Sequence, residues 1–407
     1  MAEEIAVTII GAGVIGCAIA CEISGDISGD IVVVEKNSRI TGENQSSRNS
    51  GVIHAGIYYP KDIGPLKSSL CVEGNSLLYE FCEKNNVPFR RTGKMVVETE
   101  VIELEYLEDV QRIALENGVP GVRLIDEKEI KKLEPNVTGI AALLVPSSGI
   151  IEPTRLVEKL SGIAESGGVM FLVENRAANI TPASNGGRFS LTVNSRGSSE
   201  EFVTGLIINC GGLFSDEIAK LIVPDSPYEM DPVKGDSAKF YCTKRENISM
   251  TGMNVYPVPF GYYPDGERAV VDFSTFRELF ARNKVSKSVG VHLSPAFDLQ
   301  GSRYETGTTV TLGPAYSKPS NKEDYRPGRT TEYFHGLVKP FFPNLELEDI
   351  SLHQTGIRAK LKDCYDFVIE SDRRYPNFIN LIGIDSPGLT SCLAIAKYVA
   401  KMVKALK

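Results

Sequence analysis

The stretch Thr8-Ile9-Ile10-Gly11-Ala12-Gly13-Val14-Ile15-Gly16-Cys17-Ala18 joins an apolar, β-branched run to three glycines and then to small residues. Gly-x-Gly-x-x-Gly between a predicted strand and a predicted helix is the pattern that binds the pyrophosphate of a dinucleotide. Gly11 permits the tight turn, Gly13 lets a phosphate approach the backbone, and Gly16 lets the helix lie close to the strand. The unpaired N–H groups and partial positive charge at the helix N-terminus attract the phosphates.

A second apolar run, Ile31-Val32-Val33-Val34, ends in Glu35. Glu35 lies about 20 residues beyond the glycines, at the position where a carboxylate accepts hydrogen bonds from ribose hydroxyls in such units. Strand, glycine turn, helix, strand and acid therefore follow one another in the order of a dinucleotide-binding βαβ unit.

Composition limits the class of protein. At 407 residues the chain is longer than one ordinary domain. A net charge of −8 argues against a nucleic-acid partner and against a polybasic membrane anchor. No stretch approaches the roughly 20 apolar residues of a membrane-spanning helix. The acidic start, Met1 to Glu4, leads directly into the first strand and leaves no room for a signal peptide. We therefore expect a cytoplasmic protein, with peripheral membrane association left open.

Cysteine and histidine usage excludes several kinds of site. The eight cysteines form no Cys-x-x-Cys pair and have no metal-ligand spacing, so we predict buried, reduced thiols and no metal. Cys17 and Cys21 lie one helical turn apart on the glycine-led helix. Only four histidines are present, which leaves few candidates for imidazole catalysis.

The order of elements predicts two spatial domains. Parallel α/β elements are followed by an insert, more α/β elements, a long antiparallel stretch over 230–315, and a terminal strand, turn and helix. Such interleaving predicts domains assembled from discontinuous segments. The fold class is α/β plus antiparallel sheet, with a Rossmann-like nucleotide-binding domain and an α+β substrate domain. The first domain takes residues 1–88, 146–223 and 351–407, and the second takes 89–145 and 224–350.

Periodicity places the main elements. Helices are expected over 70–85, 103–117, 154–166 and the final 20 residues or so, and strands over 95–97, 169–173, 189–193, 206–209 and 378–384. Ser215 is expected to cap one helix, and Asp385 the last one. The polar, glycine-bearing segment 37–60 is longer than most loops in compact domains, which indicates a functional loop.

Five stretches together resemble the D-amino-acid-oxidase superfamily of FAD-dependent oxidoreductases. They are the glycine turn with Glu35, Ser46 to Gly51, Ile208 to Leu213, Thr355 to Arg358, and Gly383 to Ser391. Within that superfamily the chain is similar to the L-2-hydroxyglutarate dehydrogenase/oxidase branch. The second resemblance is carried by residues 49–59, Lys67, Leu70-Cys71, Gly93-Lys94, Val291-His292-Leu293 and Leu312-Gly313-Pro314, while residues 41–47 depart from the branch.

The resemblance implies that the flavin ring lies where a FAD-binding domain meets an antiparallel substrate domain. It implies that the pyrophosphate contacts Gly11, Ala12, Gly13, Val14, Ile15 and Gly16, and that the adenosine contacts Glu35, Lys36 and Ala177. The rest of the cofactor would contact Ser46, Ser47, Asn49, Ser50, Gly51, Val52, Cys210, Gly211, Gly356, Ser386, Gly388, Leu389, Thr390 and Ser391. The turn at 386–391 also has a physical rationale, because backbone N–H groups at a helix N-terminus stabilise negative charge on a reduced flavin.

The implied reaction is oxidation of a small 2-hydroxy acid, with hydride transfer to flavin N5 and removal of the hydroxyl proton by a base. His54, which follows the shared loop, is a candidate base; the alternative is that it only holds that loop beside the flavin. His292 lies in an apolar strand and is either a substrate contact or a satisfied core histidine. His335 and His353 are expected to be structural.

Arg358 is the candidate for binding the substrate carboxylate, because a guanidinium pairs with a carboxylate through two hydrogen bonds. The alternative is an interdomain ion pair. Tyr58, Tyr59 and Lys234 are further candidates for polar contacts, although core packing is expected for the tyrosines. A five-carbon diacid also requires a second cationic or multi-donor pocket, which the sequence does not locate.

L-2-hydroxyglutarate, oxidised to 2-oxoglutarate, is the leading candidate substrate. The alternatives are amine oxidation of the glycine or sarcosine type, glycerol 3-phosphate oxidation, and a non-catalytic flavin-binding subunit. A protein using only NAD is disfavoured, because loop 41–56 and the turn at 383–391 would have no purpose. A quinone, a carrier protein and oxygen all stay open as the electron acceptor.

Overall fold

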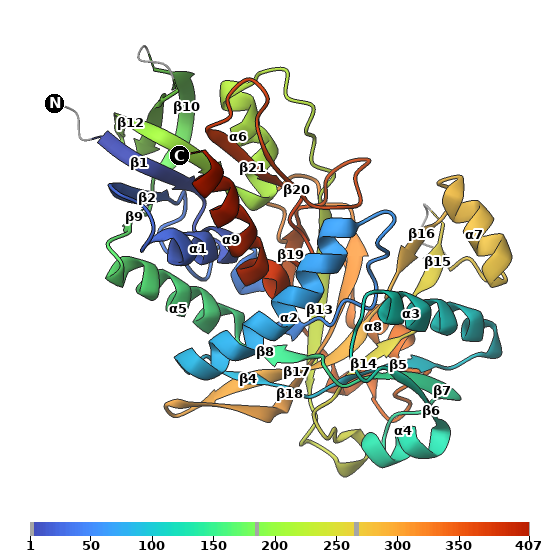
Figure 1. Ribbon diagram of the computed structural model, residues 1–407. Helices are drawn as coiled ribbons and strands as arrows, with labels where there is room; N and C mark the ends of the chain where they lie inside the picture. The colour runs from blue at the N-terminus through green and yellow to red at the C-terminus, as the bar shows by residue number, and fades with distance from the viewer. Residues whose placement is uncertain (1–3, 184–186, 264–267, 407) are drawn as a thin grey trace.

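The computed structural model describes residues 4–183, 187–263 and 268–406 and contains two large sheets, each with its own helices (Figure 1). The first sheet lies at the upper left of Figure 1 and the second at the lower right. Segments from the start, middle and end of the chain meet in the first sheet.

The first sheet has eight strands within the described residues, and its centre is parallel. β9, β2, β1, β12 and β21 run parallel to one another, while β10, β11 and β20 are added by antiparallel pairing. The parallel centre confirms the predicted Rossmann-like unit. The strands are β1 (Glu4–Ile10), β2 (Asp30–Val34), β9 (Met170–Leu172), β10 (Arg176–Pro182), β11 (Phe189–Ser195), β12 (Ser198–Asn209), β20 (Val368–Ser371) and β21 (Phe378–Ile382).

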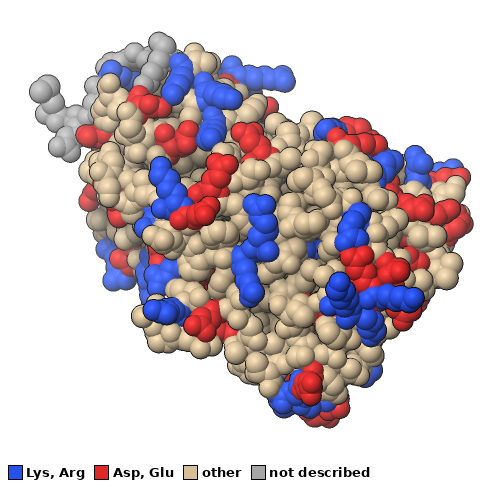
Figure 2. Space-filling view, turned by 60° about the horizontal axis from the view of Figure 1, so that its bottom comes forward, with Lys and Arg blue, Asp and Glu red and all other residues tan. Residues whose placement is uncertain are grey.

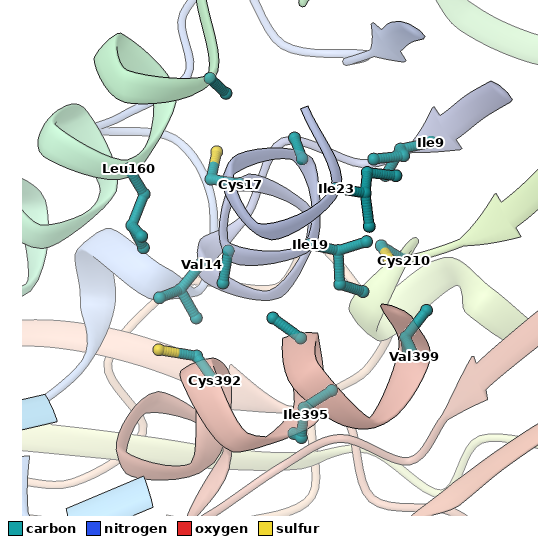
Figure 3. Packing of buried hydrophobic residues seen from close by; sticks show 14 of the residues in the cluster. Ile9, Val14, Cys17, Ile19, Ile23, Leu160, Cys210, Cys392, Ile395 and Val399 are labelled. Atoms are coloured by element: carbon teal, nitrogen blue, oxygen red, sulfur yellow. The ribbon is translucent and has the colours of Figure 1, made fainter. Parts of the chain in front are cut away.

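Both faces of this sheet are covered, which explains why its strands are apolar at successive positions. Val7 and Ile9 of β1 pack with α1, α2, α5 and α9, whereas Ile10 packs on the other side with α6 and β11. Figure 3 shows α1 between α5 and α9, with Ile9 on one side and Val399 below. The helices are α1 (Val14–Ile23), α2 (Pro65–Asn85), α5 (Pro153–Ser166), α6 (Ser215–Ile222) and α9 (Gly388–Ala405).

The second sheet has the order β19-β13-β18-β17-β14-β5-β7-β6. It is antiparallel as expected, except that β14 runs parallel to β5, a strand from outside the 230–315 stretch. The fold class is therefore confirmed. The strands are β5 (Lys94–Glu98), β6 (Arg123–Asp126), β7 (Ala141–Val145), β13 (Val233–Tyr241), β14 (Asn254–Pro257), β17 (His292–Gln300), β18 (Arg303–Ser317) and β19 (Ser351–Arg358).

Alternation along the second sheet separates a packing face from the face that carries the site. Met95 and Val97 of β5 join the apolar cluster beneath α8, whereas Val96 joins a different cluster with α3 and α7. The helices are α3 (Leu104–Glu116), α4 (Glu127–Leu133), α7 (Phe273–Ala281) and α8 (Thr331–Val338), and the short strands are β3 (Val52–Ile53), β4 (Phe89–Arg90), β8 (Gly149–Ile151), β15 (Phe260–Tyr262) and β16 (Ser286–Ser288).

Three local features differ from the sequence-based expectation. β19 is an edge strand of the second sheet, although the predicted boundary at residue 351 put it in the first domain. Helix α2 begins at Pro65 rather than at residue 70, and the Asp366 carboxylate accepts hydrogen bonds from the N–H groups of Leu66 and Lys67. Ser215 does not cap α6 but is its first residue, because its hydroxyl donates to the Gly212 carbonyl instead. The rest of the domain division stays a prediction.

Charges of both signs are interspersed on the face of the molecule seen in Figure 2. Within the described residues, no helix is both long and apolar enough to cross a membrane.

Candidate active site

A cavity of about 2440 Å³ runs from the glycine turn to the exposed face of the second sheet. Pockets for one small ligand usually enclose about 300 to 1,000 Å³, so this cavity has room for a dinucleotide and a substrate together. Most of the predicted site residues line it. They are Gly11, Gly13, Val14, Ile15, Glu35, Lys36, Ser46, Asn49, Ser50, Val52, His54, Ala177, Cys210, Gly211, His292, Gly356, Arg358, Ser386, Gly388 and Leu389.

The glycine turn has the predicted backbone geometry. Gly11 has a φ of +108°, and a side chain there would collide with the Cys210 carbonyl. A side chain on Gly16 would collide with the Gly11 carbonyl, so helix and strand approach as closely as the pattern requires. The N-terminus of α1 consequently faces the cavity.

Glu35 is held at the end of β2 by two backbone groups. Its Oε2 accepts a hydrogen bond from Ala12 N–H at 2.8 Å, and its Oε1 accepts one from Asn37 N–H at 2.9 Å. The side chain is 5% exposed, and burial raises the pKa of its carboxyl group, although both N–H groups act in the opposite direction. The carboxylate therefore has a fixed position at the cavity wall.

The long loop after β2 closes over the glycine turn. Ser46 Oγ accepts a hydrogen bond from Val14 N–H at 2.9 Å, which places this hydroxyl at the N-terminus of α1. Ser47 points elsewhere, because its hydroxyl binds within the loop to Gly42 N–H and the Asn44 side chain. Six predicted cofactor contacts lie outside the set of lining residues: Ala12, Gly16, Ser47, Gly51, Thr390 and Ser391.

The turn before α9 forms the opposite end of the cavity. Gly388 and Leu389 line it, and Thr390 Oγ1 accepts a hydrogen bond from His54 N–H at 3.0 Å. The prediction that Asp385 caps α9 is wrong: the N-cap is Pro387, and Asp385 Oδ1 lies 2.7 Å from Lys67 Nζ. Both partners of this ion pair are largely buried, so it ties α2 to the turn.

The second sheet contributes a row of side chains from β14, β17 and β19, with β18 and β13 between the last two. Tyr256 on β14, His292 on β17 and Arg358 on β19 all line the cavity. Lys234 lies on the opposite face of β13, between the lining residues Val233 and Gly235, and pairs with Asp324 at 3.3 Å. Since successive side chains of a strand point to opposite faces, the prediction that Lys234 contacts substrate is wrong.

The surroundings of both candidate histidines favour the neutral imidazole. Burial, together with the charges of Lys94 and Arg358, lowers the pKa of His54 and of His292 well below 6.5. His292 stacks on Tyr256 with ring centroids 3.8 Å apart, and its Nδ1 lies 3.1 Å from the Ser294 hydroxyl. These contacts fix the His292 ring while leaving its Nε2 without a contact among the described residues.

Arg358 is a half-buried cation with no ion pair among the described residues. Burial disfavours its charge, but Tyr316 and Asp385 outweigh that effect and raise the pKa of the guanidinium. Its Cζ lies 4.4 Å from the centre of the Tyr316 ring. An interdomain ion pair, the alternative considered from the sequence, is absent among the described residues, so the guanidinium is free to bind an anion.

Two residues that contribute to the site, Lys94 and Gln45, were not predicted from the sequence. Lys94 is 1% exposed and lies behind the row of side chains, with its Nζ 3.8 Å from the centre of the Tyr256 ring. Gln45 accepts a hydrogen bond from Ile357 N–H and donates one to the Tyr325 hydroxyl, both at 2.7 Å. The sequence signals for Lys94 were its position in an apolar strand, Lys94-Met95-Val96-Val97, and the Gly93-Lys94 pair of the family resemblance; Gln45 had no such signal.

Comparison with known proteins identifies the family. Residues 6–402 match the family model described as FAD dependent oxidoreductase. The chain belongs to the FAD-dependent oxidoreductase family. Its cofactor is FAD, and the prediction of a flavin enzyme is confirmed.

Several relatives of this FAD-dependent oxidoreductase carry the same name. An L-2-hydroxyglutarate dehydrogenase from Indibacter alkaliphilus is 30% identical over 414 residues, covering 96% of each chain. The mitochondrial L-2-hydroxyglutarate dehydrogenase of Homo sapiens is 27% identical and covers 98% of this chain and 88% of its own. Among solved structures, the FAD-bound L-α-glycerophosphate oxidase of Mycoplasma pneumoniae has a TM-score of 0.81 at 23% identity, covering 99% of this chain and 95% of its own. That last likeness shows the shared fold.

The cavity fits FAD by its own geometry. A side chain on Gly13 would come no closer than 3.4 Å to its nearest neighbour, Ser46 Oγ, so this backbone is open to a phosphate. Two helix N-termini, those of α1 and α9, reach the same cavity. Each offers N–H groups to an anionic part of the cofactor.

Proposed function

We propose that this enzyme oxidises L-2-hydroxyglutarate to 2-oxoglutarate with FAD. The observation that carries the proposal is Arg358, a half-buried guanidinium that lines the FAD cavity near the two candidate histidines. The names of the full-length relatives supply the particular hydroxy acid.

The charge of the site supports an anionic substrate. Lys67 is neutralised by Asp385, whereas Arg358 and Lys94 have no carboxylate partner within the described chain. Burial lowers the pKa of Lys94 to about 7, and a negative charge bound nearby favours its charged form, so a bound dianion offsets the cost of holding both cations in the site. A dicarboxylate therefore suits the site better than a monocarboxylate or a neutral amine.

The cofactor contacts carried over from the family resemblance remain part of this proposal. We assign the pyrophosphate to the turn at Gly11, Gly13 and Gly16, and a ribose to Glu35. The flavin end is assigned to Gly356 and the turn at 386–391. The physical support is that residues at the N-termini of α1 and α9 line the cavity, where helix termini attract negative charge.

The protein's own residues bind the substrate and accept its proton. FAD, when bound, supplies the hydride acceptor. Arg358 binds the C1 carboxylate and so fixes C2. His54 and His292 are the two candidate acceptors for the hydroxyl proton, since a neutral imidazole can take up a proton that an imidazolium cannot. The histidine that accepts the proton becomes positively charged beside the anionic substrate.

Glycerol 3-phosphate is the second candidate substrate. A phosphate site would require clustered cations, whereas Arg358 on β19 and Lys94 on β5 stand at separate positions in the second sheet, so this substrate ranks below the dicarboxylate. Sarcosine and glycine provide no second negative charge for Lys94.

A substrate panel tests the proposal. The purified, FAD-loaded enzyme is mixed without oxygen with either enantiomer of 2-hydroxyglutarate, sarcosine or glycerol 3-phosphate, and bleaching of the flavin is recorded. We expect bleaching by L-2-hydroxyglutarate and not by its enantiomer. Bleaching only by glycerol 3-phosphate or sarcosine would replace the proposed substrate, and no bleaching by any of them would refute the proposal.

The cytoplasmic location also stays a proposal. The eight cysteines are all unpaired thiols, which suits a reducing compartment. Cell fractionation with an antibody to the protein tests it.

A further inference from the structure

Three side chains stack in a row at one end of the active-site wall. The Lys94 ammonium lies 3.8 Å from the centre of the Tyr256 ring, and the His292 ring lies 3.8 Å from the same centre. The Lys94 ammonium and the His292 ring cannot both occupy one face of the Tyr256 ring at that distance. The Tyr256 ring is therefore held between them. The Lys94 ammonium also lies 5.3 Å from the centre of the Tyr58 ring.

Two hydroxyl groups of this cluster have no partner. The Tyr256 and Tyr58 hydroxyl oxygens are both buried without a hydrogen bond among the described residues, and both residues line the cavity. Leaving a buried hydroxyl unpaired is unfavourable, so the pair indicates a ligand that accepts their hydrogen bonds. The positive charge of Lys94 beside them indicates that the ligand is an anion.

The position of Lys94 in the sheet separates it from Arg358. In the strand order β19-β13-β18-β17-β14-β5, Arg358 lies on the first strand and Lys94 on the last, with His292 between them. Both cations act on the electrostatics of His292 and His54. The histidines therefore lie between two separate positive centres.

We propose that Tyr58, Tyr256 and Lys94 form a second anion subsite, which takes the substrate carboxylate remote from the reacting carbon. The two phenols donate hydrogen bonds to it, and the ammonium supplies charge from behind the Tyr256 ring. This inference rests on the proposed function and deepens it, because it makes the enzyme selective for dicarboxylates. It also supplies the second multi-donor pocket that a five-carbon diacid requires.

The test uses the FAD-loaded enzyme and two matched substrates. L-2-hydroxyglutarate has the remote carboxylate, and L-2-hydroxyvalerate has a methyl group in its place. The Tyr58→Phe/Tyr256→Phe variant removes only the two hydroxyls and keeps both rings against Lys94. The Tyr316→Phe variant is the control, since Tyr316 lies beside Arg358 at the end that both substrates share.

We expect the wild type to prefer hydroxyglutarate and the double variant to lose at least about 100-fold in kcat/KM for it, because two hydrogen bonds to a charged group are removed. Activity with hydroxyvalerate should change less than threefold. Tyr316→Phe should lower both activities by the same factor. Equal losses for both substrates in the double variant, or no preference in the wild type, would overturn the subsite.

A binding measurement separates this inference from the proposed reaction. Glutarate and valerate are titrated into the oxidised enzyme, and the change in the flavin spectrum gives each dissociation constant. Tighter binding of glutarate that weakens in the double variant supports the subsite even if hydroxyglutarate is not oxidised. Equal binding of the two acids contradicts it even if hydroxyglutarate is a substrate. Flavin content and unfolding temperature confirm that the variants are folded.

Discussion

Replacing Lys94 by Met should stabilise the enzyme, although it removes a residue of the proposed anion subsite. Burial lowers the pKa of Lys94 from 10.5 to about 7. Each pKa unit corresponds to about 1.4 kcal/mol, so holding this lysine charged in the native state costs up to about 5 kcal/mol. Loss of the interaction with the Tyr256 ring offsets about 2 kcal/mol of the gain. A net stabilisation of about 3 kcal/mol follows.

The sign of the pH dependence makes this prediction specific. Below about pH 7 the lysine is charged in both states, and the whole penalty applies. Between pH 7 and 10.5 the unfolded chain binds a proton that the native protein does not, so the wild type gains stability as pH rises. The advantage of Lys94→Met should therefore be greatest near pH 6 and shrink by pH 9. Neighbouring titratable groups stay neutral across that range because burial shifts their pKa values outside it; they are His54, Tyr58, Cys71, Tyr256 and His292.

Urea unfolding of the FAD-loaded wild type and Lys94→Met at pH 6 and pH 9 measures the effect. Lys287→Met is the control, because Lys287 is partly exposed and pairs with Asp109 at 2.9 Å. Its replacement should not stabilise the protein at either pH. A Lys94→Met variant that is less stable than the wild type at pH 6, or equally affected at both pH values, would refute the reasoning.

Arg358→Met should weaken binding of 2-oxoglutarate at least 100-fold, since two hydrogen bonds to a charged group are lost, while FAD content stays unchanged; equal losses of affinity and flavin would mean a structural role. Because burial depresses the pKa of both histidines, kcat/KM should show no loss near pH 6.5 and should fall only at more acid pH; an inflection at 6.5 would contradict a buried base. His54→Asn and His292→Asn, compared by the rate of flavin reduction, identify the proton acceptor as the variant with the larger loss. Gln45→Ala should raise KM several-fold more than it lowers kcat, because Gln45 holds Ile357 beside Arg358; an unchanged KM would show that this contact is dispensable.

The cofactor end of the site could be predicted from sequence because its chemistry belongs to the backbone. Gly11 requires a positive φ and Gly16 requires close helix packing, and both needs appear directly as residue types within one local stretch. Glu35 comes directly after the second strand, and its distance along the chain from the glycine turn is fixed by the one helix between the two strands. The parallel first sheet and the presence of FAD follow from the same local pattern, without knowledge of distant contacts.

Side-chain roles near loops were harder to predict. Ser215 and Asp385 both have the residue type and position of helix caps, yet each takes another partner. The partner of Asp385 is Lys67, more than 300 residues earlier in the chain, and a local pattern carries no information about it. Lys234 was misassigned because the sequence gives the alternation of a strand but not which face meets the cavity.

The sequence by itself determined the nucleotide-binding unit, the apolar strands of both sheets and the candidate residues Arg358, His54 and His292. Only the tertiary structure decided that β5, from the early insert, pairs with β14 and brings Lys94 against Tyr256. It also decided that β19 is an edge strand whose free Ile357 N–H is taken by Gln45. The physical reason is that local propensity fixes strands and turns, whereas the order of strands in a sheet depends on pairings between residues far apart in the chain.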